Sequence, residues 1–149
     1  MAGHMWFSPV IPQTADGILS ANRVFQTAVA SIPALQNLPI LNLRPFSLPS
    51  PFMERAFLMI MGFPITDNPD LNSACVQAFR ELIRVGAEYG WGEYRTPPLF
   101  YDQVMDVYSY NDQRLLRLHE SIKDVVDPNG ILAAGRYGIW PAHLRRQRA

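Results

Sequence analysis

Apolar residues follow two different spacings along the chain, and the spacing predicts where strands and helices lie. Residues 5–12 and 57–61 are short runs of large apolar side chains, which is typical of strands. Within residues 18–32 and again within 74–85, apolar residues recur at every third or fourth position, which is typical of helices packed by one face. The first half of the chain therefore predicts a strand followed by a helix, repeated once.

The ends of these elements carry recognisable signals. We expect Asp16 to cap the first helix and Pro33 to end it. Pro69 suits the first turn of the second helix, and Gly90 suits its end. Five of the thirteen prolines fall within residues 33–52, so this connection is irregular or a broken edge strand. Either a plain surface loop or the entrance to an active site fits it.

Later in the chain, residues 90–96 read as a third strand, in which Tyr94 and Arg95 point to opposite faces. Helical spacing returns in residues 99–105 and 111–126. We therefore expect an α+β fold: a small, largely antiparallel sheet with helices on one face, followed by a C-terminal helical segment. The apolar residues of the last helix recur at three and four positions: Leu115, Leu118, Ile122 and Val125.

Composition narrows the range of functions. A chain of 149 residues fits one domain and can bury a real core. With 48% hydrophobic residues, 17% charged residues and a formal net charge of zero, the chain gives no sign of a nucleic-acid surface. The basic run at 145–148 fits a solvated tail better than a nucleic-acid site. A neutral or small aromatic ligand suits such a protein best.

The single cysteine excludes an internal disulfide and a cysteine-based metal site. Cys75 is expected to be a small buried apolar residue, and we predict no metal ligands. No apolar run reaches the roughly 18–20 residues that a membrane span needs, so no membrane partner is expected. The first residues lack a charged region followed by an apolar block. We expect a cytoplasmic protein, with a periplasmic one left open if a signal precedes this chain.

Two short motifs lie in the second half of the chain, and both carry an arginine. Residues 90–96 read Gly-Trp-Gly-Glu-Tyr-Arg-Thr and contain Tyr94 and Arg95. Residues 127–136 read Asp-Pro-Asn-Gly-Ile-Leu-Ala-Ala-Gly-Arg and end on Arg136. Asp-Pro and Asn-Gly are typical of a turn. Taken alone, the first motif also fits a surface strand whose glutamate and arginine form a cross-strand ion pair.

Together the two motifs, followed by Gly-Ile-Trp-Pro at 138–141, resemble the carboxyl-terminal part of the vanillyl-alcohol oxidase and 4-cresol methylhydroxylase family of flavoenzymes. The resemblance runs from about residue 3 to residue 141. It implies that residues 1–96 are part of a cap, or substrate, domain, half of a ferredoxin-like unit. It also implies that residues 97–149 form the segment that returns to an FAD-binding domain.

The resemblance implies an FAD-dependent oxidoreductase that acts on para-substituted phenols. Tyr94 and Arg95 would bind the phenol, and Arg95 and Arg136 would place positive charge near the flavin. Ionising a phenol with a pKa near 10 at pH 7 costs roughly 4 kcal/mol, and a nearby cation lowers an acid's pKa by about 1–3 units. Two arginines and a tyrosine hydroxyl can therefore keep the substrate as phenolate. Hydride transfer to the flavin would then leave a quinone methide.

His4 has two interpretations. In some members of the family a histidine before a strand of this kind carries the flavin covalently, and residues 3–9 match that context. A Gly-His-Met start is also a common cloning remnant or a frayed terminus. Some relatives place histidines on the second strand, where Ala56 and Phe57 stand here, which puts a histidine contact to the substrate in doubt.

The resemblance also predicts what this chain lacks. The family's FAD-binding domain and its catalytic acid/base would lie outside this sequence, so we expect a carboxyl-terminal fragment that is inactive alone. Expected partners are the missing FAD-binding domain, a phenolic substrate, a possible cytochrome electron acceptor and a second copy of the chain. The alternative function is a free-standing α+β binding or interaction module that has kept this fold without redox chemistry.

Overall fold

The structure is a computed structural model that describes residues 3–33, 46–48 and 54–145. The pattern of internal contacts divides the chain into two compact units, Met1–Pro97 and Pro98–Ala149. Each unit is described by itself. The roles predicted for residues 1–96 and 97–149 in a larger flavoprotein stay predictions. Most of the proline-rich connection between residues 33 and 52 lies outside the described residues.

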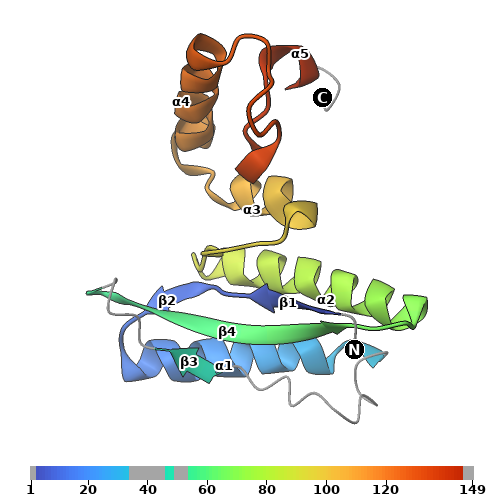
Figure 1. The fold of residues 1–149 in the computed structure, drawn as a ribbon. Coiled ribbons are helices and arrows are strands. Elements are labelled where there is room, and N and C mark those ends of the chain that lie inside the picture. Colours follow the sequence, from blue (N-terminus) through green and yellow to red (C-terminus); the bar gives the residue numbers. More distant parts are fainter. Residues whose placement is uncertain (1–2, 34–45, 49–53, 146–149) are drawn as a thin grey trace. The chain divides into compact units, whose positions relative to one another are not determined.

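The first unit is built around one long strand, β4 (Ala56–Ile65) (Figure 1). Two short strands, β1 (Gly3–Phe7) and β2 (Val10–Pro12), pair with one edge of β4, and β3 (Phe46–Leu48) pairs with the other. Every pairing is antiparallel. The largely antiparallel sheet predicted from the sequence is therefore confirmed.

Strands β1 and β2 are one strand interrupted by Pro9. Phe7 lies opposite Met61 and Val10 lies opposite Leu58, so the two short strands continue in the same register along β4. The carbonyl oxygen of Pro9 still accepts a hydrogen bond of 3.1 Å from the Met59 N–H. Proline has no N–H to complete the ladder there. The single strand predicted over residues 5–12 therefore has a break at its middle.

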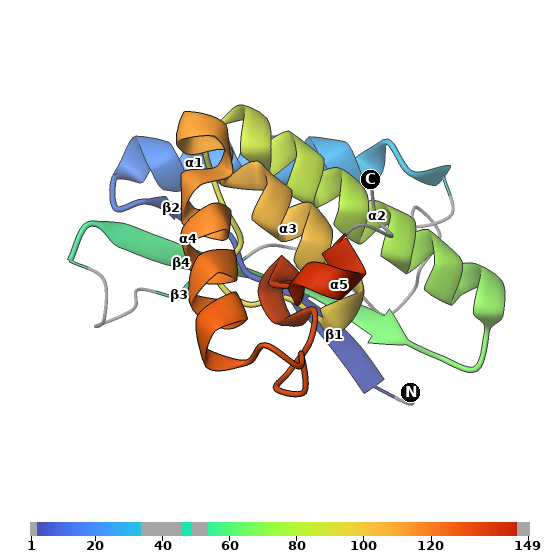
Figure 2. The same cartoon turned by 90° about the horizontal axis from the view of Figure 1, so that it is seen from above.

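Two helices cover one face of the sheet, α1 (Ala15–Ala30) and α2 (Pro69–Glu88) (Figure 2). The cap of α1 is Thr14, whose hydroxyl accepts the Gly17 N–H at 2.9 Å. The prediction that Asp16 caps this helix is wrong, because Thr14 has the extended backbone that a cap requires and Asp16 lies in the first turn. In α2 the predicted position of Pro69 at the first turn is confirmed.

The core between the sheet and the helices is aromatic. Phe7 of β1 lies edge-on to Phe25 of α1 and Phe79 of α2, with ring centroids 5.2 and 5.4 Å away. Phe63 of β4 lies 5.8 Å from Phe79. All four rings are fully buried, and burying a phenylalanine side chain contributes roughly 1.5–3 kcal/mol. This cluster fixes both helices on the same face of the sheet, as predicted.

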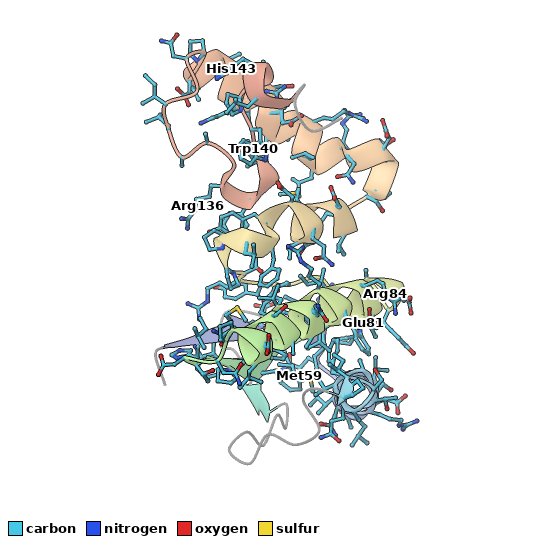
Figure 3. The ribbon with its side chains drawn as sticks, turned by 90° about the vertical axis from the view of Figure 1, so that its right-hand side faces the viewer. Met59, Glu81, Arg84, Arg136, Trp140 and His143 are labelled. Atoms are coloured by element: carbon cyan, nitrogen blue, oxygen red, sulfur yellow. The ribbon has the colours of Figure 1, made fainter. Side chains whose placement is uncertain are left out.

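Sulfur-containing side chains also contribute to this core. Met59 and Met61 of β4 are 2% and 1% exposed and belong to the core. Cys75 is buried in α2, as expected, and burial raises the pKa of its thiol. On the outer surface of α2, Glu81 and Arg84 form a salt bridge with an N–O distance of 2.6 Å (Figure 3).

The predicted third strand over residues 90–96 is wrong. Only Glu93 makes a β-bridge, an isolated one to Pro9, and the residues after it form a bend. Gly90 has a φ of +73° and turns the chain out of α2. The bridge is held by two backbone hydrogen bonds, from the Tyr94 N–H to the Ser8 carbonyl and from the Val10 N–H to the Gly92 carbonyl, and the pairing does not continue past Glu93. Tyr94 and Arg95 therefore lie on a bent segment and do not alternate across a sheet.

The second unit is a helical segment. The predicted helices over residues 99–105 and 111–126 are confirmed, although α4 buries none of its apolar residues. Leu115, Leu118, Ile122 and Val125, which we call the α4 stripe, are between 45% and 81% exposed. The elements of this unit are η2 (Pro98–Phe100), α3 (Tyr101–Val107), α4 (Tyr110–Val126), η3 (Arg136–Gly138) and α5 (Ala142–Arg145). Among the described residues, no helix is both long and apolar enough to cross a bilayer.

Candidate functional site

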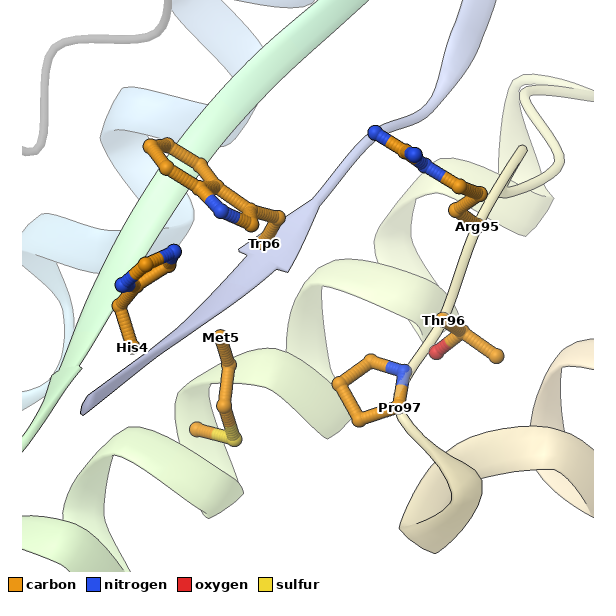
Figure 4. Close-up of a pocket in the computed structure, with 6 residues that line it drawn as sticks. All are labelled: His4, Met5, Trp6, Arg95, Thr96 and Pro97. Atoms are coloured by element: carbon orange, nitrogen blue, oxygen red, sulfur yellow. The ribbon is translucent and has the colours of Figure 1, made fainter.

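A pocket lies along the free edge of β1, between this strand and the segment that follows Glu93 (Figure 4). Its volume is about 370 Å³, and it is open to solvent on one side. The pocket is lined by His4, Met5, Trp6, Arg95, Thr96 and Pro97. The structure thus brings together two residues that the sequence proposed for the site, His4 and Arg95, from opposite ends of the unit.

One wall of the pocket is aromatic. His4 and Trp6 are two residues apart on β1 and therefore share the face that points away from the helices. Their rings meet edge-on with centroids 4.8 Å apart. The Trp6 indole lies over Gly62 of β4, where a Cβ atom would sit only 3.1 Å from the indole ring. Glycine at this position lets the tryptophan lie flat against the sheet.

The other wall supplies the positive charge. Arg95 is exposed, and the carbon at the centre of its guanidinium group lies 5.8 Å from the centroid of the Tyr94 ring. Tyr94 is 45% exposed and is not among the residues that line the pocket, but its ring lies beside the guanidinium group of Arg95. The structure therefore places Arg95 at the pocket with Tyr94 beside it.

Backbone hydrogen bonds attach this wall to the break between β1 and β2. The Tyr94 N–H donates to the Ser8 carbonyl at 2.9 Å, and the Val10 N–H donates to the Gly92 carbonyl at 2.8 Å. Trp91 anchors the segment from the other end, since its ring packs against Phe25 in the core with a centroid distance of 5.6 Å. Trp91 therefore covers the edge of the core.

Glu93 is the residue that the sequence prediction missed. Instead of forming a surface ion pair it is buried, 7% exposed, and its Oε1 accepts the Ser8 N–H at 2.8 Å. Burial raises the pKa of this carboxyl group to about 8, and the Ser8 N–H and the Thr96 hydroxyl only partly offset that effect. The hint that the sequence offered was the position of Glu93 between Trp91 and the two candidate ligands Tyr94 and Arg95.

The second motif forms a loop anchored by Asp127. The two carboxylate oxygens of this buried residue accept the N–H groups of Ile131 and Leu132, each at 2.9 Å. Asp127 also forms an ion pair with Lys123 of α4. The hydrogen bond from Lys123 and those two N–H groups lower the pKa of the Asp127 carboxyl group against the opposing effect of burial. The conspicuous aspartate of this motif therefore shapes the loop that leads to Arg136.

Arg136 lies at the end of that loop, beside a pocket of about 350 Å³ within the second unit (Figure 3). Gly135 has a φ of +81°, and a Cβ atom there would come within 2.5 Å of the Trp140 ring, so this position requires glycine. The indole N–H of Trp140 donates to Asp102 at 3.0 Å. The pocket is lined by Pro98, Tyr101, Ala133, Ala134, Gly135, Arg136 and Trp140.

Replacing Asp127 with asparagine is expected to loosen this loop. Asparagine lacks the charge that pairs with Lys123 and has one acceptor oxygen in place of two. Amide hydrogen exchange at Ile131 and Leu132 should become about tenfold faster, which is the effect of losing one such hydrogen bond. The exposed Asp106 provides the control, since Asp106→Asn should leave both rates unchanged. Unchanged exchange in Asp127→Asn would show that the carboxylate does not shape the loop.

Within the described ranges, no group of three or more histidine, cysteine, aspartate or glutamate side chains is arranged to bind a metal ion. The candidate ligands are instead cations and aromatic rings: His4, Trp6 and Arg95 in the first unit, and Arg136 in the second. Such a set suits a planar, negatively charged aromatic molecule.

No protein-family model matches the chain. Over 72 residues it is 36% identical to the 4-cresol dehydrogenase (hydroxylating) flavoprotein subunit of Pseudomonas putida, a match that covers 48% of this chain and 13% of that protein. A 4-ethylphenol oxidase from Gulosibacter chungangensis, solved with isoeugenol, is 31% identical with a TM-score of 0.75, over 96% of this chain and 26% of that one. A p-cresol methylhydroxylase with bound substrate is 26% identical with a TM-score of 0.76, over 93% and 24%.

The fold and these matches define the chain as a homologue of the cap region of FAD-type oxidoreductases. It is homologous to part of the 4-cresol dehydrogenase flavoprotein subunit and similar to part of the 4-ethylphenol oxidase. The chain spans about a quarter or less of the length of these relatives.

Proposed function

We propose that this chain is the cap-domain part of an FAD-dependent oxidoreductase that oxidises para-substituted phenols. The observation that carries the proposal is the pocket on the free edge of β1, where Arg95 faces the aromatic wall of His4 and Trp6. The homology to phenol-oxidising flavoproteins supports the same substrate class.

Residues of this chain would bind the substrate as phenolate. The Arg95 guanidinium can donate two hydrogen bonds to a phenolate oxygen, and such charge-assisted bonds are about twice as strong as neutral ones. Tyr94, which lies beside Arg95, can add its hydroxyl. Ionisation makes the ring electron-rich, which favours departure of a hydride from the para-benzylic carbon and leaves a quinone methide. FAD, when bound, supplies the acceptor for that hydride.

The residues present fit a flavin as well as a phenol. The His4 imidazole is exposed at the mouth of the pocket, edge-on to Trp6, so it is accessible for a covalent bond to a cofactor. Arg136 is exposed on its loop, where it can pair with the negative charge of a reduced ring system. We propose His4, Arg95 and Arg136 as the cofactor contacts of this chain, with the catalytic acid/base contributed from outside it.

The second unit is proposed to dock onto the FAD-binding domain. The α4 stripe exposes four apolar side chains on one helix, and Ile131 and Leu132 add further exposed apolar surface at 78% and 63%. Large exposed apolar patches mark interaction sites. In the chain on its own, the same surface would favour association between copies.

Replacing Leu118 and Ile122 together with lysine tests this docking surface. Each apolar side chain contributes roughly 1.5–3 kcal/mol when it is buried, so the double variant should weaken self-association of the chain more than tenfold. Sedimentation equilibrium measures the dissociation constant. Leu19→Lys is the control, because Leu19 is an exposed apolar residue of α1 that lies outside the stripe. Equal association of the double variant and the unaltered chain would show that the stripe is not the contact surface.

The proposed function is tested by titrating the chain with 4-nitrophenol. The phenolate form of this probe absorbs visible light, whereas its neutral form does not. If Arg95 binds phenolates, the chain should lower the pH midpoint of the probe's ionisation by about one unit or more, within the range that a nearby cation produces. An unchanged midpoint at saturating protein would contradict phenolate binding and favour a binding module with another ligand.

A further inference from the structure

The carboxyl group of Glu93 lies at the point where the wall that carries Arg95 meets the sheet. Its Oε1 accepts the Ser8 N–H at 2.8 Å, and the Ser8 carbonyl in turn accepts the N–H of Tyr94 at 2.9 Å. Ser8 is itself 2% exposed and lies in the break between β1 and β2. The N–H and the carbonyl group of Ser8 are therefore both hydrogen-bonded, the first to Glu93 and the second to Tyr94, which are consecutive in the chain.

The two hydrogen bonds to Ser8 hold this segment against the sheet in the absence of a longer strand pairing. The bridge between Pro9 and Glu93 is isolated, and its two hydrogen bonds run from the Tyr94 N–H to the Ser8 carbonyl and from the Val10 N–H to the Gly92 carbonyl. The hydrogen bond from the Ser8 N–H to the Glu93 carboxyl group adds a third attachment, on the Ser8 side of the bridge.

The attachment bears directly on the pocket. Tyr94 and Arg95 follow Glu93 immediately in the chain, and Thr96 and Pro97 complete the wall. The backbone direction at Glu93 therefore decides where the Arg95 guanidinium points. A displacement of about 1 Å at a binding group is enough to lower catalytic efficiency by roughly 100-fold.

We propose that Glu93 is a positioning residue: its buried carboxyl group fixes the bend that carries Tyr94 and Arg95 to the junction of β1 and β2. This inference rests on the proposed function for its effect on phenolate binding. The attachment itself is independent of any ligand. Glu93 touches neither substrate nor cofactor in this account and acts only through the two residues after it.

Two substitutions separate the attachment from simple destabilisation. Glu93→Gln keeps an oxygen at the same place, so the Ser8 N–H retains its acceptor. Glu93→Ala removes the acceptor and leaves that buried N–H unpaired. The first measurement is amide hydrogen exchange by NMR in the unaltered chain and in both variants. The amides to follow are those of Ser8 and Tyr94, with the core amide of Leu82 in α2 as the internal reference.

We expect Glu93→Ala to accelerate exchange at Ser8 and Tyr94 at least tenfold while Leu82 changes less than twofold, and Glu93→Gln to keep the original rates. Equal rates at Tyr94 in the alanine variant and the unaltered chain would overturn the inference. A uniform acceleration that includes Leu82 would also overturn it, because it would show a general loss of stability.

The second measurement is the dissociation constant of 4-nitrophenolate for the same three proteins. We expect an increase of about tenfold in Glu93→Ala and less than twofold in Glu93→Gln. Unchanged affinity in the alanine variant would overturn the positioning role. If the unaltered chain binds no phenolate, the proposed function fails, and the exchange rates at Tyr94 alone decide whether Glu93 fixes the bend.

Discussion

Replacing Arg95 with methionine is expected to raise the dissociation constant of 4-nitrophenolate by about 10- to 100-fold. A hydrogen bond to a charged group contributes roughly 1.5–3 kcal/mol, and each 1.4 kcal/mol is a tenfold change in affinity. Methionine keeps much of the apolar stem and removes the cation. Absorbance titration at a pH where the probe is fully ionised measures the constant without interference from its protonation.

Two further variants show whether the loss of affinity is due to the charge and geometry of Arg95. Arg95→Lys keeps the charge but lacks the planar pair of donors, so an intermediate loss is expected. Arg84→Met removes an exposed arginine of α2 that pairs with Glu81, and it should leave the affinity unchanged. If Arg95→Met binds the probe as tightly as the unaltered chain does, the pocket beside β1 is not a phenolate site.

Titration of Glu93 is expected to make the first unit less stable as the pH rises. The folded-state pKa of about 8 lies above the ordinary value of 4.5, so the folded protein retains this proton where the unfolded chain has lost it. The contribution is fully present below about pH 4.5 and is lost as the pH rises through about 8. A shift of this size corresponds to a contribution on the order of 5 kcal/mol at most.

The measurement is urea unfolding from pH 5 to pH 9, compared between the unaltered chain and Glu93→Gln. Glutamine cannot titrate, so the difference in the free energy of unfolding between the two proteins should change steadily across this range in favour of the variant. A flat difference for Glu93→Gln would contradict a raised pKa at the buried carboxyl group.

The elements that the sequence predicted well are those whose signals are local. The apolar spacing of α2 and the proline in its first turn both act within a few residues. The long apolar run of β4 can bury its side chains only at the centre of a sheet. The cap of α1 was misplaced by two residues because threonine and aspartate are both good caps, and only the backbone angles at Thr14 decide between them.

The predictions that failed depended on contacts distant in the sequence. Residues 90–96 have the composition of a strand, but a strand needs a partner edge, and this segment pairs with the edge formed by β1 and β2 at one bridge only. Glu93 looked like a surface acid because its burial depends on Ser8, 85 residues away. Helical spacing in α4 correctly predicted a helix, although it could not show that the α4 stripe is exposed in this chain.

For the candidate site, the motifs identified the residues but not their arrangement. The first motif pointed to Arg95 and the context of residues 3–9 pointed to His4, and the pocket beside β1 contains both. They gave Asp127 no role, yet its carboxylate shapes the loop before Arg136. A motif shows which residue types occur together, whereas the atoms that anchor them depend on the fold.

The most direct test of a phenol-oxidising role is a chimera in which this chain replaces the matching part of the 4-ethylphenol oxidase. The chimera is purified with FAD, and flavin reduction by 4-ethylphenol is followed without oxygen by the loss of flavin absorbance. The account predicts reduction by 4-ethylphenol, and reduction slowed at least tenfold when Arg95 is replaced with methionine. A chimera that binds FAD and yet shows no reduction by the phenol would contradict it.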